Sequence, residues 1–124
     1  MLVNEFRLKL YVKNFDGMAR FYEETLGFEP VDSWDNGPDD RGVLLDTGSG
    51  IVEIISAGSL YAPVQGCDVS LEVDDVWGLW EELQGLPVIH ALRQNRWGDS
   101  SFCIRDPEGL RLTFFSPDRD HELN

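Results

Sequence analysis

The chain has few residues of the kinds that build disulfide frameworks or zinc sites. It contains two cysteines, Cys67 and Cys103, and two histidines, His90 and His121, among 124 residues. The cysteines are far apart and lack CxxC spacing, so we expect free, buried thiols. Basic residues are scarce as well, since 10 Lys and Arg against 23 Asp and Glu give a net charge of −13. This charge disfavours nucleic acid and anionic membranes as partners and favours cations.

Long apolar segments are also missing. No apolar run approaches the length that spans a membrane, and the first five residues lack the basic and apolar regions of a signal peptide. We therefore expect a cytoplasmic protein. The sequence contains no Gly-rich phosphate loop after a strand and no arrangement of nucleophile and base. A chain of this length with 42% apolar residues is expected to fold as a single domain, residues 1–124.

Residues 5–57 show the pattern of a strand, a helix and three further strands. The first strand is predicted by alternation of apolar and polar residues, and its apolar face is Phe6, Leu8, Leu10 and Val12. Asn14 or Asp16 is expected to cap the helix, which should end at Gly27. The following strands are expected at residues 28–34, 42–47 and 51–55.

The same order of elements begins again after residue 66. A strand ending at Val73 precedes a helix that Asp74 or Asp75 can cap and that should bury Trp80, and further strands are expected at residues 88–92, 102–105 and 110–115. The halves match at an offset of about 61 residues, in the pairs Val12 and Val73, Phe15 and Val76, and Gly17 and Gly78. We therefore predict two modules, at about residues 5–57 and 67–117, with a linker at 58–66 and a polar tail at 118–124.

Two motifs make this pattern resemble a known family. Asp106-Pro107-Glu108-Gly109 is a tight-turn sequence that should join the last two strands, and Trp97-Gly98 precedes the first of them. The run from Phe21 to Phe28, Phe-Tyr-Glu-Glu-Thr-Leu-Gly-Phe, should end the first helix. Together these segments resemble the vicinal-oxygen-chelate superfamily, which includes glyoxalases, dioxygenases and bleomycin-resistance proteins. The resemblance covers residues 8–117.

The resemblance implies an α+β fold. Its two βαβββ modules form a curved mixed sheet with a concave pocket, and the helices lie on the outer face. In metal-dependent members, side chains on the concave face hold a divalent ion, and the corresponding positions here are Arg7, Glu53, Asp68 and Thr113. Arginine cannot ligate a cation and threonine is a weak ligand, so only Glu53 and Asp68 remain as donors. We therefore expect no cofactor, with a divalent metal as the alternative.

The residues on these strand faces are candidates for binding an organic ligand. Several are charged or polar, and the aromatic ones suit a planar or cationic molecule. Arg7 is expected to pair with Glu53 and Asp68, and Trp34 and Trp97 should lie at the rim. The candidate site is Arg7, Lys9, Tyr11, Trp34, Glu53, Asp68, Ser70, Trp97, Arg111, Thr113 and Phe115.

The chain is most similar to the metal-free bleomycin-resistance type, which is acidic and dimeric. This resemblance implies a homodimer that binds a small organic ligand, with antibiotic resistance as a possible role, and the charge favours a cationic ligand. A drug, a natural-product intermediate and a metabolite all remain open, as does pairing of modules within or between chains. One alternative is a lyase or dioxygenase of the glyoxalase type with metal on Glu53 and Asp68. Another is a regulatory module whose pocket is filled by its own side chains.

Overall fold

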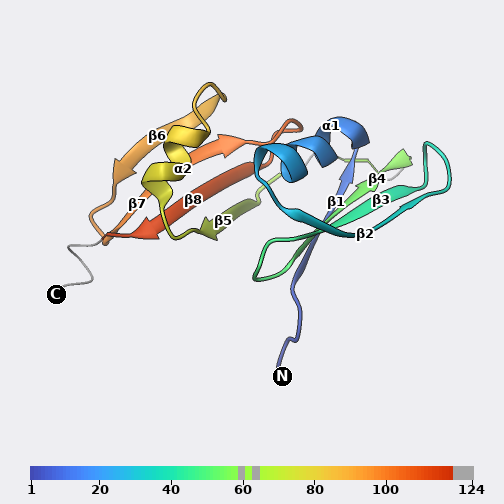
Figure 1. Ribbon diagram of the computed structural model, residues 1–124, viewed down its shortest axis with the longest axis horizontal. Coiled ribbons are helices and arrows are strands. Elements are labelled where there is room, and N and C mark those ends of the chain that lie inside the picture. Colours follow the sequence, from blue (N-terminus) through green and yellow to red (C-terminus); the bar gives the residue numbers. More distant parts are fainter. Residues whose placement is uncertain (59–60, 63–64, 119–124) are drawn as a thin grey trace. The chain divides into compact units, whose positions relative to one another are not determined.

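The chain forms two compact units, Met1–Pro63 and Val64–Asn124. The computed structural model describes residues 1–58, 61–62 and 65–118 (Figure 1). The predicted tail from residue 119 onward, with His121, and residues 59–60 and 63–64 of the predicted linker lie outside the described residues. In the part of the chain described, no helix is both long and apolar enough to cross a membrane.

The first unit is a four-stranded sheet with helical structure on one face. Its strands lie in the order β1-β4-β3-β2, with β1 parallel to β4 and the other pairs antiparallel. The α-helix packs on β4 and β3. The elements are β1 (Arg7–Val12), α1 (Phe15–Arg20), the π-helix η1 (Phe21–Thr25), β2 (Glu29–Asp35), β3 (Arg41–Asp46) and β4 (Ile51–Ser56).

The helix of the first unit differs from the prediction. We expected an α-helix through to Gly27, but the α-helical hydrogen bonds give way after Arg20 to a π-helical turn. In this turn Leu26 N donates to Phe21 O at 3.0 Å, five residues back. Phe21 and Tyr22 are both buried, and their rings meet edge to face with centroids 5.2 Å apart. The wide turn thus accompanies two adjacent aromatic residues that both enter the core.

The second unit repeats this architecture. Its sheet order is β5-β8-β7-β6, with β5 parallel to β8, and α2 packs on β7 and β8 (Figure 1). The predicted α+β class and the two βαβββ halves are confirmed, as two separate four-stranded mixed sheets. The elements are β5 (Asp68–Glu72), α2 (Val76–Glu82), β6 (Val88–Gln94), β7 (Asp99–Arg105) and β8 (Arg111–Pro117).

The internal repeat extends to the helix caps. Asn14 Oδ1 accepts a hydrogen bond from Gly17 N at 3.1 Å, and Asp75 Oδ1 accepts one from Gly78 N at 3.0 Å. A β-carbon at either glycine would lie within 2.5 Å of the capping side chain. The close approach of the cap therefore explains why glycine occupies the third helical position in both units.

Three predictions of burial were wrong. Phe6 precedes β1 and is exposed, because the strand begins at Arg7. Cys67 is exposed just before β5, whereas Cys103 is buried as expected. Trp80 is only half-buried, although its ring contacts Phe102 at a centroid distance of 5.1 Å. Alternation assigns a residue to a face, but it does not show where the covering helix ends.

Candidate functional site

Five of the predicted site residues share one face of the first sheet. Residues paired in register on neighbouring strands point to the same side. In the register of the sheet, Lys9 pairs with Glu53 and Tyr11 pairs with Ile55. Ile55 pairs in turn with Gly42 on β3, and Gly42 pairs with Trp34 on β2. The opposite face carries Leu10, Val12, Val43, Leu45, Val52 and Ile54, which are buried. The face that α1 leaves uncovered therefore holds Arg7, Lys9, Tyr11, Trp34 and Glu53.

Arg7 and Glu53 form an ion pair on this uncovered face. The distance from Arg7 Nη1 to Glu53 Oε1 is 3.6 Å, and Arg7 Nε also donates to Glu5. The hydrogen bond and charge of Glu5, with a smaller contribution from Glu53, raise the pKa of Arg7 above its ordinary value. Arg7 is therefore a permanent cation, and it partly neutralises Glu53, which is only 8% exposed.

Aromatic rings lie on the same face. The Lys9 ammonium is 5.8 Å from the centre of the Tyr11 ring, within the range of a cation–π contact. Trp34 Nε1 donates to Asp40 Oδ1 at 3.0 Å, so the loop after β2 fixes the indole. The indole covers Gly42, where an added β-carbon would lie 2.0 Å from Trp34 Cη2. Glycine at position 42 is therefore what allows the tryptophan to lie flat on the sheet.

We expect Gly42→Ala to displace the Trp34 indole and break its hydrogen bond to Asp40. Because Trp34 is half-buried and can move, the loss of stability should be modest, about 1 kcal/mol. Tryptophan emission should shift to the red as the indole becomes more exposed. The control is the same substitution in a Trp34→Phe background, where the spectral change should vanish. An unchanged emission spectrum for Gly42→Ala would contradict the described position of the indole.

The second sheet brings five further predicted residues onto one face. Asp68 pairs in register with Arg111, Ser70 with Thr113, and Glu72 with Phe115. Arg111 Nε is 3.4 Å from Asp68 Oδ1, so Asp68 has a cationic neighbour within its own unit. A cavity of about 380 Å³ lies beside this pair, lined also by Cys67 and Arg105. Asp68, Ser70, Arg111, Thr113 and Phe115 therefore share the uncovered face, whereas Trp97 lies in the turn between β6 and β7 and is 65% exposed.

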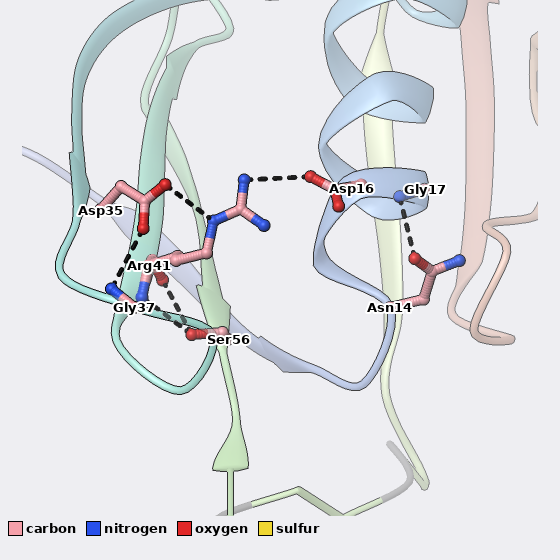
Figure 2. A network of polar contacts seen from close by, with 7 residues as sticks. All are labelled: Asn14, Asp16, Gly17, Asp35, Gly37, Arg41 and Ser56. Atoms are coloured by element: carbon pink, nitrogen blue, oxygen red, sulfur yellow. Dashed lines mark hydrogen bonds and ion pairs between the residues drawn. The ribbon is translucent and has the colours of Figure 1, made fainter.

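A polar cluster around Arg41 was not predicted from the sequence. Figure 2 shows its guanidinium between the carboxylates of Asp16 and Asp35, with Nη2 3.0 Å from Asp16 Oδ1 and Nε 3.5 Å from Asp35 Oδ2. The guanidinium carbon lies 4.4 Å from the centre of the Phe15 ring. The hydrogen bond to Asp16 is the main cause that raises the pKa of Arg41, against the opposing effect of burial. The sequence did contain one indication of this cluster, because Arg41 is the only Lys or Arg between Arg20 and Arg93.

This cluster lies on the helix-covered side of the first sheet. Arg41 is at the start of β3 and Asp16 is in the first turn of α1, so the contact joins helix to sheet. The cluster lines a cavity of about 580 Å³, and Ala19 and Glu23 of the helical segment line it as well. Arg41 N donates to Ser56 Oγ at 2.8 Å, which ties the backbone of β3 to the end of β4 (Figure 2). The guanidinium thus occupies a cradle of one aromatic ring and two carboxylates.

The four positions that correspond to metal ligands do not fit a divalent metal. Arg7 pairs with Glu53, Asp68 pairs with Arg111, and Thr113 offers a neutral hydroxyl. Both carboxylates are thus already engaged by guanidinium groups, and the four positions themselves supply neither imidazole nor thiolate. Across residues 1–58, 61–62 and 65–118, no three His, Cys, Asp or Glu side chains are grouped so that they could hold a metal ion.

A family model described as Glyoxalase/Bleomycin resistance protein/Dioxygenase superfamily matches residues 5–114. Among solved structures, TioX from Micromonospora sp. ML1 is similar with a TM-score of 0.77 and 22% identity, over 93% of this chain and 99% of that chain. TnmS3, an antibiotic binding protein from Streptomyces sp. CB03234, has a TM-score of 0.73 and 20% identity, over 94% and 98%. Lactoylglutathione lyase from Agrobacterium tumefaciens has a TM-score of 0.67 and 21% identity, over 89% and 90%. No curated protein sequence matches the chain at a significant level.

Proposed function

Because the chain belongs to the glyoxalase/bleomycin resistance protein/dioxygenase superfamily, we propose that it binds a small organic cation without an essential metal. The observation that carries the proposal is the pairing of Arg7 with Glu53, because a fixed cation stands at a position where metal-dependent members have a ligand. The net charge of −13 supports a cationic ligand through long-range attraction. The similarity to TnmS3, which is an antibiotic binding protein, is consistent with a ligand of drug size.

The uncovered strand faces supply suitable chemistry for such a ligand. Tyr11 and Trp34 provide aromatic surface, and Trp34 is fixed by its bond to Asp40. Glu53 is buried and Arg7 neutralises only part of its charge, so a ligand cation gains from lying close to it. In this proposal the ligand is oriented by rings and selected by charge.

The proposal is tested with two planar probes of nearly the same shape and different charge. N-methylacridinium is a permanent cation, and acridine is neutral above neutral pH. We expect the cation to quench tryptophan fluorescence saturably and to raise Tm, and acridine to bind about tenfold more weakly. Glu53→Gln should reduce the affinity for N-methylacridinium by about tenfold. Asp39→Asn, in the loop between β2 and β3, removes the same charge elsewhere and should leave the affinity unchanged.

Equal binding of the two probes, or no binding of either, would refute the preference for cations.

The similarity to lactoylglutathione lyase favours a metal-dependent lyase as the second candidate. That candidate requires near-stoichiometric metal in the purified protein and loss of activity on chelation. Elemental analysis before and after dialysis against a chelator therefore separates the two functions. The proposal includes a homodimer, which sedimentation equilibrium tests directly.

A further inference from the structure

The two units differ at a group of matched positions on the side of each sheet that the helix covers. In the first unit, Arg41 lies beside Ser56, the last residue of β4, and pairs with Asp35 on β2. In the second unit, the residue beside Ser116 on β8 is Ser100, which pairs with Gln94 on β6. The second helical residue is Asp16 in α1 and Trp77 in α2. A short hydroxyl in the second unit thus takes the place of the long guanidinium side chain in the first.

The cavity of about 580 Å³ into which the first unit places Arg41 has a counterpart in the second unit, where no guanidinium comes from the matching position. A cavity of about 570 Å³ lies there, lined by residues that include Trp77, Gln94, Ser100 and Asp118. Ser100 matches Arg41 itself, Gln94 matches Asp35, and Trp77 matches Asp16. Asp118 follows directly after β8. The internal repeat therefore shows which chemical group fits at this place, because the first unit holds a guanidinium there.

Asp118 gives this cavity a buried negative charge. The residue is 6% exposed, and its carboxylate accepts hydrogen bonds from Ser100 Oγ at 2.6 Å and from Gln94 Nε2 at 3.1 Å. Both donors are neutral, and among the described residues no Lys or Arg forms an ion pair with Asp118. A buried carboxylate with only neutral partners is stabilised strongly by a cation that reaches it.

We propose that this cavity binds the guanidinium group of a small ligand, with Asp118 as the anionic partner and Trp77 as the aromatic wall. Arg41 likewise lies among carboxylates and a ring, those of Asp16, Asp35 and Phe15. In the second unit the carboxylate and the ring come from other positions of the repeat. Arg93 also lines the cavity, with its Nε donating to Asn95 Oδ1 at 3.2 Å. Its charge opposes any cation in the cavity, so the attraction for the guanidinium must come from Asp118, and each further cationic group on a ligand would weaken binding.

This site is separate from the strand faces invoked for the proposed function. Ser100 pairs with Ser116 on the helix-covered side of the second sheet, whereas Arg111 and Thr113 are on the uncovered side. Substitutions in the cavity therefore leave Glu53, Tyr11 and Trp34 intact. Failure of one proposal does not imply failure of the other.

The test uses n-butylguanidinium and its neutral isostere n-butylurea, with binding followed by amide and indole NMR shifts. We expect n-butylguanidinium to move the resonances of Trp77, Gln94 and Ser100 saturably, and n-butylurea to bind about tenfold more weakly. Asp118→Asn should lower the affinity for n-butylguanidinium by about tenfold. Asp74→Asn, an exposed neighbour outside the cavity lining, is the charge-matched control and should bind as the unaltered chain does.

Ser100→Arg is the second variant, and it places a guanidinium in the cavity from within the chain. It should fold with a Tm at or above that of the unaltered protein and should not bind n-butylguanidinium. Equal binding of the two probes would overturn the proposal, as would unchanged binding in Asp118→Asn or Ser100→Arg. A large fall in Tm on Ser100→Arg would also overturn it, because the cavity would then not accept the group that the first unit accommodates.

Discussion

Phe102→Ala is expected to lower the free energy of unfolding by about 3–5 kcal/mol. Phe102 is fully buried in β7, between the Trp80 ring at 5.1 Å and the Phe114 ring at 5.3 Å. Removing its ring leaves a cavity at the contact between α2 and the second sheet, and it also removes two aromatic contacts. Urea denaturation followed by circular dichroism measures the loss.

Phe6→Ala is the matched control for this prediction. Phe6 is 71% exposed and precedes β1, so the same chemical change should alter stability by less than about 0.5 kcal/mol. A loss below about 1 kcal/mol for Phe102→Ala would contradict the described core of the second unit. A comparable loss for both variants would mean that Phe6 is covered in solution. The pair thus tests where the first strand begins as well as which aromatic residue organises the second sheet.

The fold could be predicted because its signals are local and occur twice. The bounds predicted for β1 and β4 are right to within one residue, and those for β8 to within two. Residue type and position narrowed each cap to two candidates, and the structure shows that Asn14 and Asp75 are the capping residues. The order of elements identified the repeat, and the structure explains why Gly17 matches Gly78, because the same contact requires both glycines.

The candidate site could be predicted only in part. Arg7 and Glu53 lie on the neighbouring parallel strands β1 and β4, where Glu53 pairs with Lys9, two residues after Arg7. Their ion pair was predicted because both were expected on the same face of the sheet. The sequence did not indicate that Asp68 would pair with Arg111, because that pairing depends on the register of β5 and β8. The cavity at Ser100 and Asp118 was missed for the same reason. Two polar residues 18 positions apart carry no local signal until strand pairing brings them together.

Ser116→Ala is expected to lower the free energy of unfolding by about 1–3 kcal/mol. The Ser116 hydroxyl is 1% exposed, accepts a hydrogen bond from Val76 N at 3.0 Å, and donates one to Val73 O. Alanine would leave the buried N–H of Val76 and the part-buried carbonyl of Val73 without their partner at the start of α2. Thermal and urea unfolding measure the effect.

Ser56→Ala is the control that the internal repeat provides. Ser56 occupies the matching position in the first unit, where its hydroxyl accepts from Arg41 N at 2.8 Å and donates to Arg41 O at 3.3 Å. Because Ser56 is only half-buried, water can replace the lost hydroxyl, and the expected loss is about 0.5–1 kcal/mol. Equal losses in the two variants would show that burial does not distinguish the positions. A larger loss for Ser116→Ala would show that the matching serines have different roles. Ser116 would then stabilise the start of α2 in the second unit, and Ser56 would only join β3 to the end of β4 in the first.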